Sequence, residues 1–197
     1  MGTLLAHLKA RHSWLLELVV IMVGTGCRLG EALRLDWSNV DAARGQLVIK
    51  RRKTADALTL ETTGPLKDAL WNLWMAGGMP TGGLVFPDSN GALRDRYRVR
   101  EALKDEGRKV SLGWITPRVF RRMAAEAAAN HSGILAASRL LGHSTVTMTQ
   151  NYLGRGEEAR GQGLKATGAL LSEALGTNCG LKSDGPDVAK DTAERKG

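Results

Sequence analysis

The sequence contains little cysteine and no hydrophobic run long enough for a membrane. Its two cysteines, Cys27 and Cys179, are far apart and lack metal-ligand spacing, so we expect no disulfide framework and a reducing compartment. The apolar segment 14–23 is too short to cross a bilayer, and no convincing signal-peptide cleavage site follows it. We therefore expect a protein of the cytoplasm with no membrane partner.

Several chemical motifs are also missing. The chain has no zinc motif, phosphate loop, dinucleotide fingerprint or Gly-x-Ser-x-Gly elbow. These absences argue against the metal-dependent, nucleotide-binding and hydrolase classes that the motifs define, and they give no reason to expect a cofactor.

Composition and charge describe a globular protein with a basic surface. Of the 197 residues, 43% are hydrophobic and 24% are charged, which is typical of one folded domain with a tail. Lys and Arg number 28 against 20 Asp and Glu, so the formal net charge is +8. Such a charge favours a polyanionic partner, of which nucleic acid is the commonest.

Periodicity and turn residues predict a mainly α protein with a small antiparallel β-sheet, an α+β fold. Thr116 followed by Pro117 is typical of a helix start, and Gly142 of a helix end. The predicted helices cover residues 13–23, 29–35, 65–76, 94–107, 117–129, 134–141 and, as a short helix or turn, 144–152. The predicted strands cover 46–50 and 57–61, and 84–86 is a short strand or buried anchor.

Five polar residues at the boundaries of these elements suit one reaction. They are Arg28, Lys53, Arg121, His143 and Tyr152. Two guanidinium groups can clamp a phosphodiester by bidentate hydrogen bonds, and a tyrosine hydroxyl can attack its phosphorus. A lysine can protonate the departing 5′ oxygen, and a histidine can donate to the phosphate. Such a set needs no metal ion.

Three segments resemble sequence boxes of the tyrosine recombinase (phage-type integrase) family. GTGCRLGEALRLDWSNVD at 24–41 is similar to the first arginine box, and TPRVFRR at 116–122 to the His-x-x-Arg box. LLGHSTVTMTQNYL at 140–153 is similar to the Leu-Gly-His…Tyr box. The pair Lys53-Thr54 falls where the family carries its β-hairpin lysine, and LVFP at 84–87 also fits. The resemblance covers roughly residues 10–155, in the family's order.

The resemblance implies a site-specific DNA recombinase or integrase. In this family the two arginines, here Arg28 and Arg121, bind the scissile phosphate, and the histidine, here His143, donates to it. Lys53 then corresponds to the general acid, and Tyr152 to the nucleophile that forms a 3′-phosphotyrosine. No cofactor, metal or ATP is implied. The implied partners are double-stranded DNA and further copies of the chain in a homo-tetramer, so the protein is expected in the cytoplasm at the nucleoid.

Two features depart from the family pattern. Arg118 stands where the family most often has the first histidine of His-x-x-Arg, and arginine cannot shuttle protons at physiological pH. We retain Arg118 as a phosphate-binding candidate. The family's N-terminal core-binding domain is expected to be absent, because the apolar helix that opens the catalytic domain begins within the first fifteen residues.

The resemblance also divides the chain. Residues 1–157 are the predicted DNA breaking–rejoining domain, and 158–176 a candidate helix for exchange with a neighbouring subunit. Residues 177–197 are polar and lack aromatics, which predicts a disordered tail.

Less specific interpretations remain beside these. Lys50 competes with Lys53 for the general-acid role, and the arginines at 94–100 fit a solvated helix face as well as a phosphate-binding one. The tryptophans at 14, 71, 74 and 114 are expected in the core or an interface, and Trp37 in the core. A truncated DNA-binding or dimerisation remnant without catalysis, and a type IB topoisomerase-like enzyme, are the alternative functions.

Overall fold

The computed structural model describes residues 1–11, 13–50, 57–143 and 145–153, and at 151 and 152 it describes the backbone alone. Lys53 lies outside this part of the chain, as do the predicted exchange helix at 158–176 and the predicted tail at 177–197.

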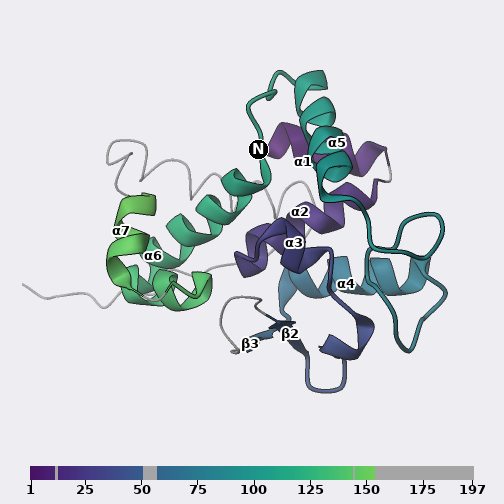
Figure 1. Cartoon of the computed structure of the whole chain (residues 1–197), viewed down its shortest axis with the longest axis horizontal. Coiled ribbons are helices and arrows are strands. Elements are labelled where there is room, and N and C mark those ends of the chain that lie inside the picture. The colour runs from purple at the N-terminus through teal and green to yellow at the C-terminus, as the bar shows by residue number, and fades with distance from the viewer. Residues whose placement is uncertain (12, 51–56, 144, 154–197) are drawn as a thin grey trace, which may run out of the picture.

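The chain folds as a mainly helical protein with one small antiparallel sheet, which confirms the predicted class (Figure 1). The helices are α1 (Gly2–Ala10), α2 (Trp14–Thr25), α3 (Leu29–Ala32), α4 (Gly64–Ala76), α5 (Arg96–Lys109), α6 (Pro117–Leu141) and α7 (Val146–Leu153), with a 3₁₀ turn η1 (Trp37–Asn39). The strands are β1 (Val40–Asp41), β2 (Gln46–Lys50) and β3 (Ala57–Glu61), in the order β1-β2-β3.

Helix α2 is the centre of the core. The Ser13 hydroxyl caps its start by accepting a hydrogen bond from the Leu15 N–H at 3.3 Å. Buried side chains lie around nearly the whole circumference of the helix, as expected for a helix that is apolar on all faces. It packs against α1, α4 and α6, which places the residues after its C-terminus between two other helices.

The sheet forms where alternation predicted it. Strands β2 and β3 have the predicted bounds and pair antiparallel, with Leu47 opposite Leu60 and Ile49 opposite Leu58. Leu47 and Ile49 are buried, so one face of β2 joins the core. Strand β1, which was not predicted, has only two residues and is too short to show a period.

Helix α1 was not predicted, and several predicted helix boundaries are wrong, three of them with a visible local cause or consequence. Helix α3 ends at Ala32 instead of 35. Helix α5 begins at Arg96 instead of 94, because the Asp95 carboxylate caps it by accepting from the N–H groups of Tyr97 and Arg98 at 2.7 and 3.0 Å. The helix from Pro117 continues past 129 to Gly133, whose positive φ of 82° separates it from the final turns of α6.

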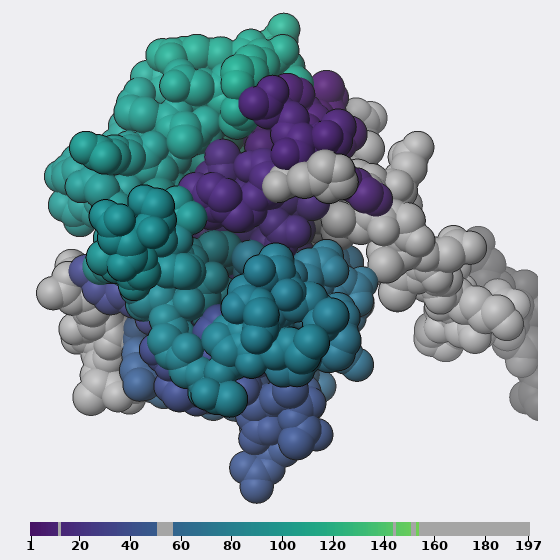
Figure 2. All heavy atoms as spheres, turned by 90° about the vertical axis from the view of Figure 1, so that its right-hand side faces the viewer, coloured from purple at the N-terminus to yellow at the C-terminus, as the bar shows by residue number. Residues whose placement is uncertain are grey.

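The tryptophans divide between core and surface. Trp37 is 8% exposed, as expected of a core residue, whereas Trp71 and Trp114 are 57% and 63% exposed and therefore lie outside the core. Helix α4, which carries Trp71, forms part of the surface seen in Figure 2. Among the described helices, none is long and apolar enough to cross a membrane.

Gly26 fixes the close approach of α2 to α6. It ends α2 in the left-handed region with a φ of 65°. A Cβ atom at this position would lie 3.1 Å from Leu141 Cδ2 and 3.3 Å from Ala124 Cβ, both on α6. Both the backbone conformation and the contact therefore require glycine here.

We expect Gly26→Ala to lower the free energy of unfolding by about 1–2 kcal/mol from the left-handed backbone alone, and further through the contact with α6. Gly24→Ala is the matched control, because Gly24 lies in α2 with only ordinary contacts to Leu66. The control should be neutral or stabilising, since alanine favours a helix more than glycine does. Urea denaturation of both variants measures the difference, and equal stabilities would contradict this account.

Candidate phosphate-binding site

Arg121 joins two helix ends. It projects from the second turn of α6, which Thr116 and Pro117 begin. Its Nη1 donates to the carbonyl of Gly26, and its Nη2 donates to the carbonyl of Leu141 at 2.7 Å. These carbonyls lie at the C-terminal ends of α2 and α6, where helices leave acceptors unsatisfied and carry partial negative charge. The guanidinium is only 6% exposed, and these two acceptors are neutral, so they do not cancel its charge.

Arg28 is held at the start of α3 by Glu31. Its backbone N–H donates to Glu31 Oε2 at 2.8 Å, and its Nη1 donates to Oε1 at 2.9 Å. The Glu31 side chain is 8% exposed while that of Arg28 is 48% exposed. The carboxylate thus fixes both the start of α3 and the arginine, as in a capping box.

His143 follows α6 through Gly142, which ends the helix in the left-handed region with a φ of 62°. Its Nε2 lies 3.4 Å from Arg121 Nη2, and its Nδ1 lies 2.8 Å from the hydroxyl of Thr149 on α7. Because a guanidinium only donates, Nε2 is the acceptor in this pair and a neutral ring carries its proton on Nδ1.

Four of the six predicted site residues line one pocket of about 330 Å³. They are Arg28, Arg118, Arg121 and His143, together with Leu29 and Pro117. None of the described residues that line it is acidic, so the pocket suits a compact anion with several acceptor oxygens.

The structure does not place the remaining two predicted site residues at the pocket, because it does not describe their side chains. Tyr152 lies on α7, three residues after Thr149, and its side chain is outside the described part of the structure, as is Lys53. Lys50 is exposed at the end of β2 and lines a hollow of about 210 Å³ with Glu31 and Arg34, on the side of the sheet that faces α3.

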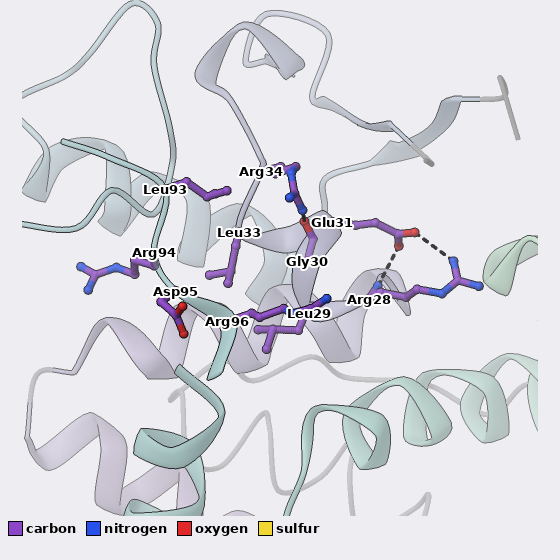
Figure 3. A pocket seen from close by; sticks show the side chains of 10 residues that line it. All are labelled: Arg28, Leu29, Gly30, Glu31, Leu33, Arg34, Leu93, Arg94, Asp95 and Arg96. Carbon is purple, nitrogen blue, oxygen red and sulfur yellow. Dashed lines mark hydrogen bonds and ion pairs between the residues drawn. The ribbon is translucent and has the colours of Figure 1, made fainter. Parts of the chain in front are cut away.

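A larger hollow of about 700 Å³ begins at Arg28 and Leu29, which it shares with the pocket. We call it the arginine groove, because Arg28, Arg34, Arg94 and Arg96 line it. In Figure 3 Arg28 and Arg94 extend from its opposite sides, and Arg34 reaches the Gly30 carbonyl at 2.9 Å. Arg94 stacks on the Trp14 ring at 4.0 Å from its centre, which fixes the loop before α5.

Among the residues that the structure describes, neither a reactive thiol nor a metal cluster adjoins the pocket. Burial raises the pKa of the Cys27 thiol to about 11, so it stays protonated and unreactive at neutral pH. In the described ranges, no group of three or more His, Cys, Asp and Glu side chains is placed to hold a metal ion.

Comparison with known proteins gives a consistent assignment. Residues 1–158 match the Phage integrase family, so the chain belongs to that family. No curated protein matches it. The fold is that of tyrosine recombinase catalytic domains.

Three solved structures illustrate the likeness. XerA recombinase has a TM-score of 0.69 and 20% identity, over 85% of this chain and 61% of that one. A lambda integrase tetramer bound to a Holliday junction has a TM-score of 0.64 and 19% identity, over 79% of this chain and 47% of that one. The lambda integrase catalytic core has a TM-score of 0.60 and 20% identity, over 72% of this chain and 88% of that one. At these identities the likeness shows the fold alone, and the chain spans less than two thirds of the first two proteins.

Sequence reasoning missed two residues that shape the site, Gly26 and Thr149. Gly26 lies in the first arginine box, but nothing in the sequence indicates that its carbonyl accepts from Arg121. Thr149 gave no signal, since a threonine in a short polar helix carries no spacing that distinguishes it. It is fully buried and contacts His143.

We expect Arg121→Lys to destabilise the fold, because one ammonium group does not span two separate carbonyls. Each buried carbonyl left unsatisfied costs about 1–3 kcal/mol. Arg118→Lys, at an exposed position lining the same pocket, should change stability by less than about 0.5 kcal/mol. Chemical denaturation compares the two, and an Arg121→Lys variant as stable as the parent would contradict the bridging role.

Proposed function

We propose that the chain is the catalytic domain of a site-specific DNA recombinase that cleaves and rejoins DNA through Tyr152. The observation that carries this proposal is the convergence of Arg28, Arg121 and His143 on one pocket. These residues come from three separate parts of the chain, and the helix that bears Tyr152 packs against the helix that bears Arg121.

In the proposed reaction the pocket binds the scissile phosphate. Arg28 and Arg121 contact its non-bridging oxygens, where negative charge grows as the phosphorus is attacked, and His143 donates through Nε2. The Tyr152 hydroxyl loses its proton to water, and its oxygen forms a bond to phosphorus as the bond to the 5′ oxygen breaks. Lys53 gives the departing 5′ oxygen a proton. A 5′ hydroxyl of another strand reverses the step, so no ATP, metal or other cofactor is required.

Arg118 gives this site one more permanent positive charge in place of a group that exchanges protons. A guanidinium remains protonated at any working pH, so Arg118 can bind phosphate but cannot relay a proton. We therefore assign proton transfer to His143 and Lys53. A chain that binds DNA without cutting it is the second candidate function, and Arg118 is the observation that favours it.

The arginine groove extends the positive surface from the pocket, and we propose that it follows the DNA backbone on one side of the cleavage point. The charge of +8 supports a polyanionic partner. Lambda integrase is bound to a Holliday junction as a tetramer, and we propose a homo-tetramer on double-stranded DNA in the cytoplasm, at the nucleoid, for this chain also. Residues 1–157 are the proposed catalytic domain and 158–176 the proposed exchange helix.

A nicked suicide substrate tests the chemistry. We expect a covalent protein–DNA adduct with the parent chain and none with Tyr152→Phe, because the phenyl ring has no oxygen to attack phosphorus. Denaturing gels measure the adduct. An adduct retained by Tyr152→Phe would contradict the nucleophile assignment. DNA binding without an adduct in the parent, on every nicked design, would favour the non-catalytic candidate.

The salt dependence of DNA binding tests the arginine groove. We expect Arg34→Ala and Arg96→Ala each to make the slope of log K against log salt shallower by about 0.9, the value for one phosphate that is no longer neutralised. Arg108→Ala is the control, because Arg108 lies at the other end of α5 and pairs with Asp105 at 2.6 Å. Slopes unchanged in both groove variants would exclude the groove as the DNA path.

A further inference from the structure

Thr149 is a buried polar residue next to the proposed site. It has no exposed surface, and its Oγ1 lies 2.8 Å from His143 Nδ1. It stands three residues before Tyr152 on α7, so one side chain joins the helix of the proposed nucleophile to a ring in the phosphate pocket.

Packing of α7 on α6 does not depend on this hydrogen bond. Leu153 is 8% exposed and forms a small apolar cluster with Ala125 and Leu141. This apolar contact helps to hold α7 on α6. The Thr149 hydroxyl can therefore act mainly on the His143 ring, by setting its orientation and the nitrogen that carries its proton.

A hydroxyl is suited to this position because it can donate or accept. Without DNA, Nε2 accepts from Arg121 and a neutral His143 ring donates through Nδ1, so the Thr149 oxygen accepts. With phosphate bound, Nε2 has to donate to it. A neutral ring then accepts at Nδ1 from the threonine hydroxyl, while an imidazolium donates at both nitrogens and the hydroxyl accepts. A carboxylate or carbonyl could serve only the states in which Nδ1 carries a proton.

We propose that Thr149 is the positioning residue of His143. Its hydroxyl bonds to Nδ1 and so keeps Nε2 directed at the pocket. It can accept from Nδ1 in one tautomer of the ring and donate to it in the other. This inference rests on the proposed function for its effect on cleavage, but the effect on the ring itself does not require DNA.

Single-turnover cleavage of the nicked substrate by the full chain tests the effect on the reaction. Thr149→Val keeps the shape and removes the hydroxyl, so we expect adduct formation to slow by about 10-fold or more, as for other groups that orient a reacting histidine. Thr149→Ser keeps the hydroxyl and should stay within about twofold of the parent. In a His143→Ala background Thr149→Val should cause no further loss, because its partner is gone. A parental rate in Thr149→Val, or a full additional loss in the double variant, would overturn the proposal.

The tautomer of His143 gives a readout that is independent of cleavage. The protein is labelled with ¹⁵N-histidine and measured without DNA. The chain has four histidines, and the signals that disappear in His143→Ala belong to His143. We expect an Nδ1-protonated neutral ring in the parent and in Thr149→Ser, and a shift toward the other tautomer in Thr149→Val. An unchanged ring in Thr149→Val would overturn the positioning role. If Thr149→Val changes the tautomer of His143 but the parent chain forms no adduct with DNA, the positioning role is supported and the proposed function is rejected.

Discussion

The structure depends on one buried guanidinium placed between two helix ends. Arg121 donates to the last carbonyls of α2 and α6, so a single cation satisfies acceptors that would otherwise be buried without partners. The segments after these helices carry Arg28 and His143. The interaction that closes the core thus also brings two distant segments to the same pocket. It also holds the arginine in place, since the side chain is buried among packed neighbours.

Immobility matters for the chemistry we propose. A pocket that stabilises charge developing on a phosphate is most effective when its donors are already oriented, because no reorganisation is then needed during the reaction. Here Arg28 is fixed by Glu31, Arg121 by two carbonyls and His143 by Thr149. Each cation or ring is therefore held by a hydrogen bond to a neighbouring group.

The fold and the site were predictable to different degrees. Alternation located β2 and β3, and Thr116, Pro117 and Gly142 marked the limits of α6, because those signals are local. The two-residue strand β1 and the exposure of Trp71 depend on tertiary packing, which no local pattern records. The motif boxes named the arginines and the histidine that share the pocket. They did not reveal Thr149 or the second use of Gly26, since both act through contacts between distant segments. The roles of Lys53 and Tyr152 stay predictions.

Gly133 divides the end of the described chain from the main body. The turns after it and α7 meet the rest of the molecule through a small apolar cluster of Ala125, Leu141 and Leu153, and through the hydrogen bond from Arg121 to the Leu141 carbonyl. Detaching the C-terminal unit would leave the Arg121 guanidinium without the Leu141 carbonyl, so the arginine that lines the pocket also fastens the segment that bears Tyr152.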